Sequence, residues 1–278
     1  MLTRIITGVV GIALAAVVIQ MGGLLFAAMG LVLMLVAWFE YVMAFRHKGM
    51  NPAFLTGVLV LLLLWGCAAF GNTDELLMTV TAMLLVILLL AVFRRGHMTF
   101  VDAAVSAAGV LYLGLPFSDM VMLRAMDTGG TMLPTAFGPM EFGCVMIWIM
   151  FIGTWSSDSF AYFAGSAFGR HKLCPLISPN KTVEGFLGGV AGTVVMTGVL
   201  GWFFQLPVPE CCVLGLVIAL LATVGDLVES IAKRYTGIKD SGKIIPGHGG
   251  VWDRFDSCLF TAPFVYYFAA YVLSETIH

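Results

Sequence analysis

The chain has 278 residues, of which 60% are hydrophobic and 11% are charged, and its mean hydropathy is +1.00. A typical soluble domain has about 25% charged residues, so this composition excludes an ordinary soluble protein and predicts a chain that lies in lipid. The formal net charge is −2. Because no basic arm or acidic tail is present, the sequence argues against nucleic acid as a partner.

Long apolar runs, separated by charges or turn residues, extend along the chain. A transmembrane helix needs about 20 mainly apolar residues, and these runs approach or exceed that length. The first run resembles a signal peptide, but more apolar segments follow it, so it is interpreted as an uncleaved span. The sequence therefore predicts an all-α fold, a polytopic bundle of about nine transmembrane helices. The predicted spans are near residues 5–20, 23–45, 53–71, 75–93, 101–123, 142–165, 184–205, 211–232 and 257–275.

The basic residues predict how these spans are oriented. If the N-terminus is cytoplasmic and the spans alternate, all 14 lysines and arginines except Arg124 fall in or beside cytoplasmic loops. The loops on the opposite side, such as "GNTDE" and "QLPVPE", contain no lysine or arginine. This is the bias that the positive-inside rule describes. We therefore expect the N-terminus in the cytoplasm and the C-terminus on the other side.

The predicted spans differ in character along the chain. Residues 1–140 contain five spans made mostly of aliphatic residues, which predicts a lipid-embedded scaffold. In residues 141–278 polar groups enter the apolar runs, which predicts the catalytic region. Gly185 and Gly189 are four residues apart and are interpreted as sites of close helix packing. Asp158 would lie in or near the membrane, where a charge usually faces a polar cavity or a partner; a structural hydrogen bond is the alternative.

One face of the eighth predicted span carries polar groups. Asp226, Ser230 and Lys233 have i, i+4, i+7 spacing and share a helix side, with Glu229 and Arg234 beside them. A carboxylate, a hydroxyl and an ammonium in line suit a metal ion and a phosphate. A solvated helix end with an ordinary ion pair would give the same pattern, so both interpretations stay open for this segment alone.

The segment "PGHGGVWDRFD" combines a glycine-rich turn with acidic and basic residues. Such a turn can leave backbone N–H groups free for phosphate oxygens, and a helix N-terminus adds positive potential. Asp253 and Asp256 are i, i+3 and offer oxygen ligands to a hard cation such as Mg²⁺. Glycine-rich turns also occur only to reverse a chain, but the surrounding His248, Arg254 and "KRYTGIKDSGK" disfavour that reading.

A further loop, "SPNKTVEGFLGG", precedes the seventh predicted span. Its Ser178, Lys181 and Thr182 resemble a loop that holds phosphate or nucleotide, although the G-x-x-x-x-G-K-[ST] order is absent. All of these polar segments are expected at the same membrane face. They supply carboxylates for a metal and cations for polyphosphate, and the sequence lacks an H-E-x-x-H motif. This combination indicates phosphoryl or nucleotidyl transfer, in which positioning and charge neutralisation dominate.

From Ser230 to Asp256 the chain reads "SIAKRYTGIKDSGKIIPGHGGVWDRFD". This segment resembles the signature of the phosphatidate cytidylyltransferases (CDP-diacylglycerol synthases), S-x-[apolar]-K-R-x4-K-D-x-G-x2-I-P-G-H-G-G-x2-D-R-x-D. Residues 157–189 resemble the same family, whereas the first half of the chain resembles it only as a bundle of spans. Ala232 departs from the pattern, because the family usually has a larger apolar residue there. That departure affects packing near Lys233.

The resemblance implies that CTP and phosphatidate react to give CDP-diacylglycerol and pyrophosphate, with Mg²⁺ and with a second cation left open. It implies a role in phospholipid biosynthesis and an all-helical membrane fold. The implied catalytic residues are Asp226, Ser230, Lys233 and Asp253, and the implied metal ligands are Asp226, Asp253 and Asp256. The implied substrate contacts are Ser178, Lys181, Thr182, Arg234, Lys239, His248, Gly249, Gly250 and Arg254, with Asp158 lining the cavity.

Two other classes of function remain as alternatives. An ion-coupled transporter would use Asp158 and Asp226 along an ion path, but it has no use for "GHGG". Another membrane lipid phosphotransferase, such as a CDP-alcohol phosphotransferase, would need a D-G-x2-A-R…G-x3-D-x3-D pattern that this sequence lacks. The expected partners are CTP, phosphatidate, the lipid bilayer and a second copy of the chain. The expected location is a bacterial inner membrane, with the active site facing the cytoplasm.

Overall fold

The computed structural model describes residues 2–274 apart from 95, 128, 131, 136, 137, 246 and 248. The predicted all-α fold is confirmed, since the strands in the described residues form only two short two-stranded sheets. The chain divides into two compact units: Met1–Met122 with Ala232–Phe255, and Leu123–Ile231 with Asp256–His278. The predicted functional division at residue 140 stays a prediction.

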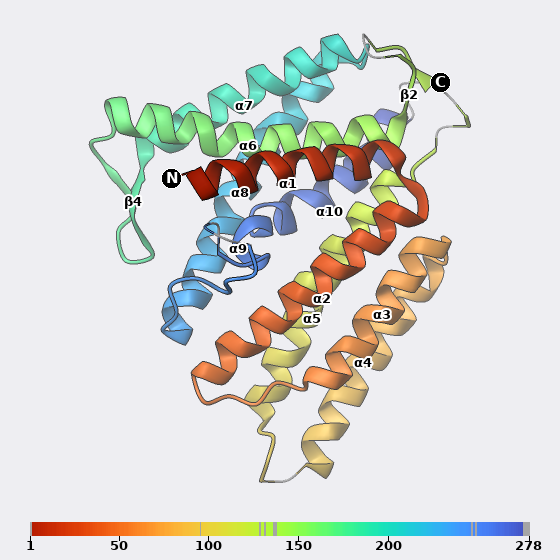
Figure 1. Ribbon diagram of the computed structural model, residues 1–278, viewed down its shortest axis with the longest axis vertical. Coiled ribbons are helices and arrows are strands. Elements are labelled where there is room, and N and C mark those ends of the chain that lie inside the picture. Colours follow the sequence, from red (N-terminus) through yellow and green to blue (C-terminus); the bar gives the residue numbers. More distant parts are fainter. Residues whose placement is uncertain are drawn as a thin grey trace. The chain divides into compact units, whose positions relative to one another are not determined.

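The first unit consists mainly of the five N-terminal helices, of which α2, α3 and α4 follow one another as neighbours (Figure 1). It also contains the last turns of α8 and the short helix α9. The bounds are α1 Leu2–Met21, α2 Gly23–His47, α3 Phe54–Phe70, α4 Asp74–Phe93, α5 Phe100–Arg124, α8 Val208–Thr236 and α9 Trp252–Phe255.

Glycines allow α3 and α5 to approach α2 closely. A Cβ atom at Gly57 of α3 would lie 2.1 Å from the Trp38 ring, and one at Gly109 of α5 would lie 2.3 Å from the Tyr41 ring. Trp38 is fully buried, and its indole N–H donates to the Phe54 carbonyl oxygen at 3.1 Å. A large aromatic side chain therefore fills the space that the missing side chains leave.

The second unit contains α6, α7, the first part of α8, α10 and the π-helical segment η1. Figure 1 shows α6 and α7 running side by side, with the hairpin of β3 and β4 joining their ends. The bounds are β1 Met132–Leu133, β2 Met140–Glu141, α6 Phe142–Phe168, β3 Lys172–Cys174, β4 Ser178–Thr182, α7 Val183–Phe203, α10 Cys258–Phe268 and η1 Ala269–Leu273.

Small residues account for the close contact of α6 with α7. A Cβ atom at Gly185 would lie 2.8 Å from the Ala161 carbonyl oxygen, and one at Gly189 would lie 2.9 Å from the Ser157 carbonyl oxygen. At Gly188 the added atom would meet the Ala164 Cβ at 2.2 Å. The interpretation of Gly185 and Gly189 as packing positions is therefore confirmed, and it follows the small-residue rule for membrane helices.

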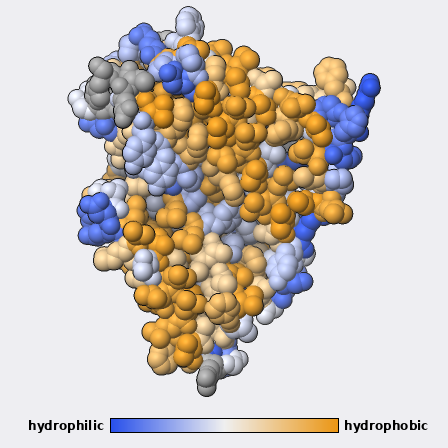
Figure 2. Space-filling view, turned by 180° about the vertical axis from the view of Figure 1, so that it is seen from behind, coloured by the Kyte–Doolittle hydropathy of each residue, from blue (hydrophilic) through white to orange (hydrophobic). Residues whose placement is uncertain are grey.

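The apolar helices make this a multi-pass membrane protein. Each predicted span coincides with a helix, and 6 of the described helices are long and apolar enough to cross a membrane by length and composition. Shorter apolar helices cover Thr7–Met21, Phe54–Phe70 and Cys258–Leu273. Large hydrophobic side chains are widely exposed on these helices, and Figure 2 shows broad areas of apolar surface. Such a surface is stable in lipid and would aggregate in water.

Candidate active site

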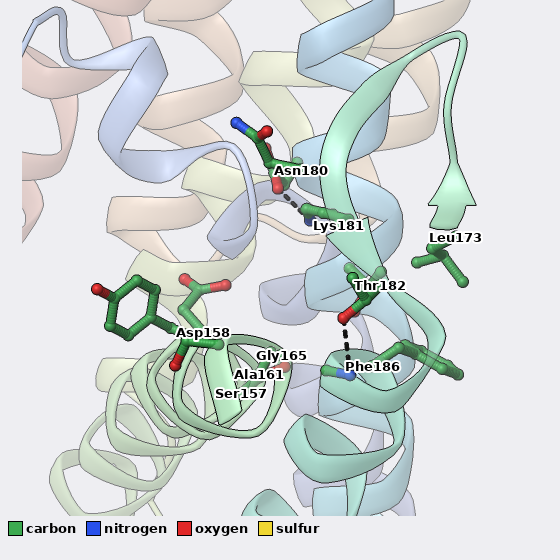
Figure 3. Close-up of a pocket in the computed structure, with 14 residues that line it drawn as sticks. Ser157, Asp158, Ala161, Gly165, Leu173, Asn180, Lys181, Thr182 and Phe186 are labelled. Carbon is green, nitrogen blue, oxygen red and sulfur yellow. Dashed lines mark hydrogen bonds and ion pairs between the residues drawn. The ribbon is translucent and has the colours of Figure 1, made fainter. Parts of the chain in front are cut away.

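A cavity of about 470 Å³ lies in the second unit beside the cytoplasmic loop that the sequence predicts between α6 and α7. Figure 3 shows Asp158 projecting from α6 on the side where Asn180 and Lys181 of β4 lie. Thr182, which ends β4, and Asp226 of α8 also line the cavity. Residues from three predicted spans and from the loop that joins two of them therefore line one space.

The β3–β4 hairpin has a well-defined base. Its strands pair antiparallel, with Lys172 opposite Thr182. Glu184, in the first turn of α7, accepts hydrogen bonds from the backbone N–H groups of Arg170 at 3.0 Å and His171 at 3.1 Å. Its other oxygen lies 2.5 Å from Nδ1 of His171. Glu184 therefore fixes the point at which the chain leaves α6 and returns to α7.

Thr182 has a structural role besides lining the cavity. It is the N-cap of α7, and its Oγ1 accepts a hydrogen bond from the N–H of Gly185 at 3.1 Å. A Cβ atom at Gly169 would lie 2.9 Å from the Thr182 side chain, so glycine is needed for this approach. N-capping by threonine satisfies a backbone donor that has no partner inside the helix. The position of Lys181 relative to α7 follows from this cap.

Lys181 and Asp226 form an ion pair inside the cavity. Their side chains are 26% and 29% exposed, so both remain accessible to a solute. The pair brings together the loop "SPNKT" and the polar face of α8, which are 45 residues apart in the sequence. Ser178 begins β4, outside the residues that line the cavity.

Three carboxylates converge where α8 meets the segment before α10. Asp226, Glu229 and Asp256 each offer an oxygen within 4.8 Å of the others. Gly225 permits this approach, since a Cβ atom there would lie 2.5 Å from the carbonyl oxygen of Asp256. Ser257 holds the segment in place by donating its hydroxyl to the Ala222 carbonyl oxygen at 3.1 Å. Glu229, which is 1% exposed, joins the cluster although the sequence analysis placed it only beside the predicted face.

The first unit holds another group of predicted residues, centred on Asp253. Its Oδ1 accepts from the Lys233 ammonium at 3.0 Å. Its Oδ2 accepts from the backbone N–H groups of Ser241 at 2.9 Å and Gly250 at 2.8 Å. Asp253 therefore organises the glycine-rich segment that precedes it. The metal role predicted for Asp253 stays a prediction.

The glycine-rich segment differs from the expectation of free N–H groups. The N–H of Gly250 donates to Asp253, and those of Val251 and Trp252 donate to Glu40 of α2. At Gly250, and at the two residues after it, the expected free donors for phosphate are therefore absent. The sequence alone could not show this, because the acceptors come from elsewhere. His248 lies outside the described residues, and the roles of Gly249 and Gly250 in substrate binding stay predictions.

The remaining predicted residues lie along the end of α8 and the segment after it. Arg234, Lys239 and Arg254 are exposed in the first unit, where they can meet anionic groups. Ser230 is half-buried on α8, one turn after Asp226. Besides the metal-ligand role of Glu229, sequence reasoning missed Glu40 as a functional candidate. Its only signal was an isolated acidic residue within the apolar run "VAWFEYVMAF".

Comparison with known proteins gives consistent matches over nearly the whole chain. A family model described as "Cytidylyltransferase family" matches residues 2–272. The chain is 39% identical over 287 residues to a phosphatidate cytidylyltransferase of Synechocystis sp., covering 97% of each chain. It is 36% identical over 276 residues to one of Bacillus subtilis, covering 96% of this chain and 97% of that one. A relative named in the same way from Staphylococcus aureus is 32% identical over 267 residues, covering 95% and 96%.

Proposed function

The chain belongs to the cytidylyltransferase family, and we propose that it transfers the cytidylyl group of CTP to phosphatidate, giving CDP-diacylglycerol and pyrophosphate. It is a nucleotidyltransferase of phospholipid biosynthesis. The transporter and the other lipid phosphotransferase are not favoured, since the relatives are named phosphatidate cytidylyltransferase over almost their full lengths.

The observation that carries the proposal is the position of Asp226. It lines the cavity, pairs with Lys181 and belongs to the three-carboxylate cluster. A phosphate oxygen of phosphatidate is already an anionic nucleophile, so it needs no strong protein base to attack the α-phosphorus of CTP. The bond from that phosphorus to the departing pyrophosphate then breaks. The protein must bring two anions together, which requires fixed positive charge near both.

The acidic cluster fits a divalent cation. Asp226, Glu229 and Asp256 supply only carboxylate oxygens, the ligand type that Mg²⁺ prefers, and their mutual repulsion would be relieved by a cation. Mg²⁺ bound there would neutralise phosphate charge and favour departure of pyrophosphate. These residues would hold the ion, and Lys181 would then be released from Asp226 to contact a phosphate. A second cation is a further part of the proposal.

The basic residues are assigned to the phosphates. Lys181 would contact the nucleotide, with Ser178 and Thr182 as neighbouring hydroxyl donors, because all belong to one hairpin. Ser230 and Lys233, on the cytoplasmic end of α8, and the exposed cations Arg234, Lys239 and Arg254 would neutralise the lipid phosphate or the pyrophosphate. Asp158 would shape the polar part of the cavity.

The bias in basic residues supports an active site that faces the cytoplasm, where CTP is made. The relatives named above are bacterial, which supports the inner membrane as the location. A homodimer is proposed as the assembly. Residues 1–140 would serve mainly as a scaffold and 141–278 would carry the chemistry.

The direct test uses purified protein in detergent with CTP, phosphatidate and Mg²⁺. Pyrophosphate release coupled to formation of CDP-diacylglycerol is expected, and omission of any one component should abolish it. Replacement of phosphatidate by CDP-diacylglycerol and an alcohol tests the phosphotransferase alternative, and ion flux in proteoliposomes tests the transporter. Flux without pyrophosphate release would refute the proposal.

A further inference from the structure

Glu40 is a buried acidic residue in the middle of the chain's N-terminal scaffold. It lies in α2, which is long and apolar enough to span a membrane, and it is 2% exposed. A carboxylate in such a setting is costly unless hydrogen bonds satisfy it. Its partners therefore indicate why an acidic residue stands at this position.

The donors to Glu40 among the described residues come from one distant segment, Ser241–Trp252. Oε1 accepts from the N–H of Val251 at 3.1 Å, and Oε2 accepts from the N–H of Trp252 at 2.9 Å. The hydroxyl of Ser241 also lies 3.2 Å from Oε2. Both ends of the segment are therefore bound by one side chain that is some 200 residues earlier in the sequence.

Two glycines of the segment are explained by the same contact. A Cβ atom at Gly242 would lie 2.2 Å from Oε1 of Glu40, and one at Gly250 would lie 2.2 Å from the Ser241 hydroxyl oxygen and 2.5 Å from Oε2 of Glu40. Neither glycine has a positive φ, so the backbone conformation alone does not require glycine there. The close approach of the Glu40 carboxylate requires glycine at position 242, and the carboxylate together with the Ser241 hydroxyl requires it at position 250.

Trp252, the last residue of the segment, is also held by α5. Trp252 is fully buried; its indole N–H donates to the Tyr112 hydroxyl of α5 at 3.2 Å, and its ring centroid lies 5.3 Å from that of Tyr41. Tyr41 follows Glu40 in α2, so α2 contacts both the backbone and the ring of Trp252. Asp253, the next residue, accepts from Ser241 and Gly250. Two carboxylates thus hold the same segment.

We propose that Glu40 is a positioning residue for cytidylyl transfer. Its carboxylate fixes the two ends of this segment, residues 241–242 and 250–252, and through them the places of Lys239 and Arg254, which flank those ends. Glu40 acts through backbone N–H groups and needs no contact with substrate. The inference rests on the proposed function for its catalytic consequence, whereas the structural effect on the segment can be measured separately.

The first test is Glu40→Gln, with Glu75→Gln as a matched control at an exposed site at the start of α4. A glutamine has one oxygen, so it can accept from Val251 or from Trp252, and its amide donor opposes the other N–H group. At a temperature well below unfolding, kcat per folded molecule should fall at least about tenfold. The KM values for CTP and phosphatidate should change less than about threefold, because no substrate contact is removed. The control should keep parental kinetics.

The second test is a double-mutant cycle between Glu40→Ala and Gly242→Ala. In the parent, Gly242→Ala should disturb the segment strongly because its methyl group meets the carboxylate. In the Glu40→Ala background those atoms are gone, so adding Gly242→Ala should change kcat less than about twofold. Equal effects of Gly242→Ala in both backgrounds would overturn the proposed contact.

Hydrogen exchange gives a readout that does not depend on activity. In Glu40→Gln, peptides covering residues 241–255 should exchange faster, while peptides from α3 and α4 should keep parental rates. If Glu40 only stabilised the fold as a whole, the exchange rates of all these peptides would rise together, and that result would overturn the proposal. A kcat within about twofold of the parent together with unchanged exchange rates would also overturn it. If the parent protein itself makes no CDP-diacylglycerol, the proposed function is wrong. The hydrogen-exchange measurement then tests by itself whether Glu40 holds the segment in place.

Discussion

The ion pair between Lys233 and Asp253 predicts an unequal response to removal of its two partners. Lys233→Met keeps the length of the side chain and deletes its charge, leaving the Asp253 carboxylate, whose side chain is 4% exposed, with less compensation. Asp253→Asn leaves the lysine, whose side chain is 20% exposed and can reorient toward solvent. We therefore expect Lys233→Met to be the more destabilising change.

The magnitude follows from the burial of each group. Breaking a fully buried pair costs about 3–5 kcal/mol. Here Asp253 keeps two backbone N–H donors, which lowers the expected cost of Lys233→Met to about 2–3 kcal/mol. For Asp253→Asn we expect about 1–2 kcal/mol, because the ion pair is lost but the ammonium that remains can turn toward solvent. With roughly 2–4 °C per kcal/mol, the melting temperature should fall about 4–12 °C in the first variant and about 2–8 °C in the second.

Thermal unfolding in detergent measures these shifts, and pyrophosphate release measures the activity of the folded fraction. If the ammonium also acts on a phosphate in the transition state, kcat should fall more than substrate affinity in Lys233→Met. Lys233→Arg should restore activity only in part, because a planar fork does not reproduce a compact ammonium. A Lys233→Met protein that unfolds within about 1 °C of the parent would refute the energetic argument. Specific activity within about twofold would refute the phosphate role.

Three other predictions concern the second unit and the membrane topology. Thr182→Ala should destabilise the protein by about 1 kcal/mol through loss of the α7 N-cap, and Thr182→Ser should retain most of that stability in thermal unfolding; equal loss in both would exclude the cap as the cause. Gly188→Ala should lower the unfolding free energy by about 1–3 kcal/mol through overpacking against α6, and an unchanged melting temperature would contradict that close contact. In a background without the native cysteines, Lys243→Cys should react with an impermeant reagent only from the cytoplasmic side and Pro209→Cys only from the other, and the opposite pattern would invert the topology.

The helices could be predicted from sequence because apolar runs of sufficient length have few alternatives in a membrane. The predicted last span, near 257–275, corresponds to α10 and η1, which begin at Cys258 and end at Leu273. The predicted eighth span, 211–232, is extended at both ends to Val208–Thr236. Its last turns carry Lys233 and Arg234, and basic residues at a helix C-terminus are favourable although they fall outside an apolar run.

The site could be predicted only where helix periodicity or a motif places residues together. Asp226 and Glu229 share a face of α8 because they are three residues apart. Asp256 joins them because Gly225 lets the later segment approach, a tertiary contact that no local pattern contains. The hydrogen bonds to Glu40 could not be predicted for the same reason. A glycine-rich turn indicates a flexible backbone, but the side chain that accepts from its N–H groups lies in α2, far away in the sequence.

The acidic residues of the signature segment divide by how their charge is compensated. Asp253 accepts from an ammonium and two backbone N–H groups. Asp256 accepts from the backbone N–H of Ser257 at 2.6 Å, but it also lies within 4.8 Å of two other carboxylates. Clustered carboxylates favour a cation, while a carboxylate that accepts several N–H groups is already stabilised by the protein.

Asp226→Asn and Asp256→Asn should therefore raise the Mg²⁺ concentration needed for half-maximal activity by about tenfold or more, as expected for the loss of one favourable ligand interaction of about 1.4 kcal/mol. Asp253→Asn should lower kcat with little change in that concentration, because its effect passes through the Ser241–Trp252 segment. A titration of pyrophosphate release with Mg²⁺ distinguishes the two classes. If Asp253→Asn shifted the Mg²⁺ requirement as strongly as Asp226→Asn, Asp253 would be a metal ligand, as the sequence resemblance implies, and the division argued from hydrogen bonds would be wrong.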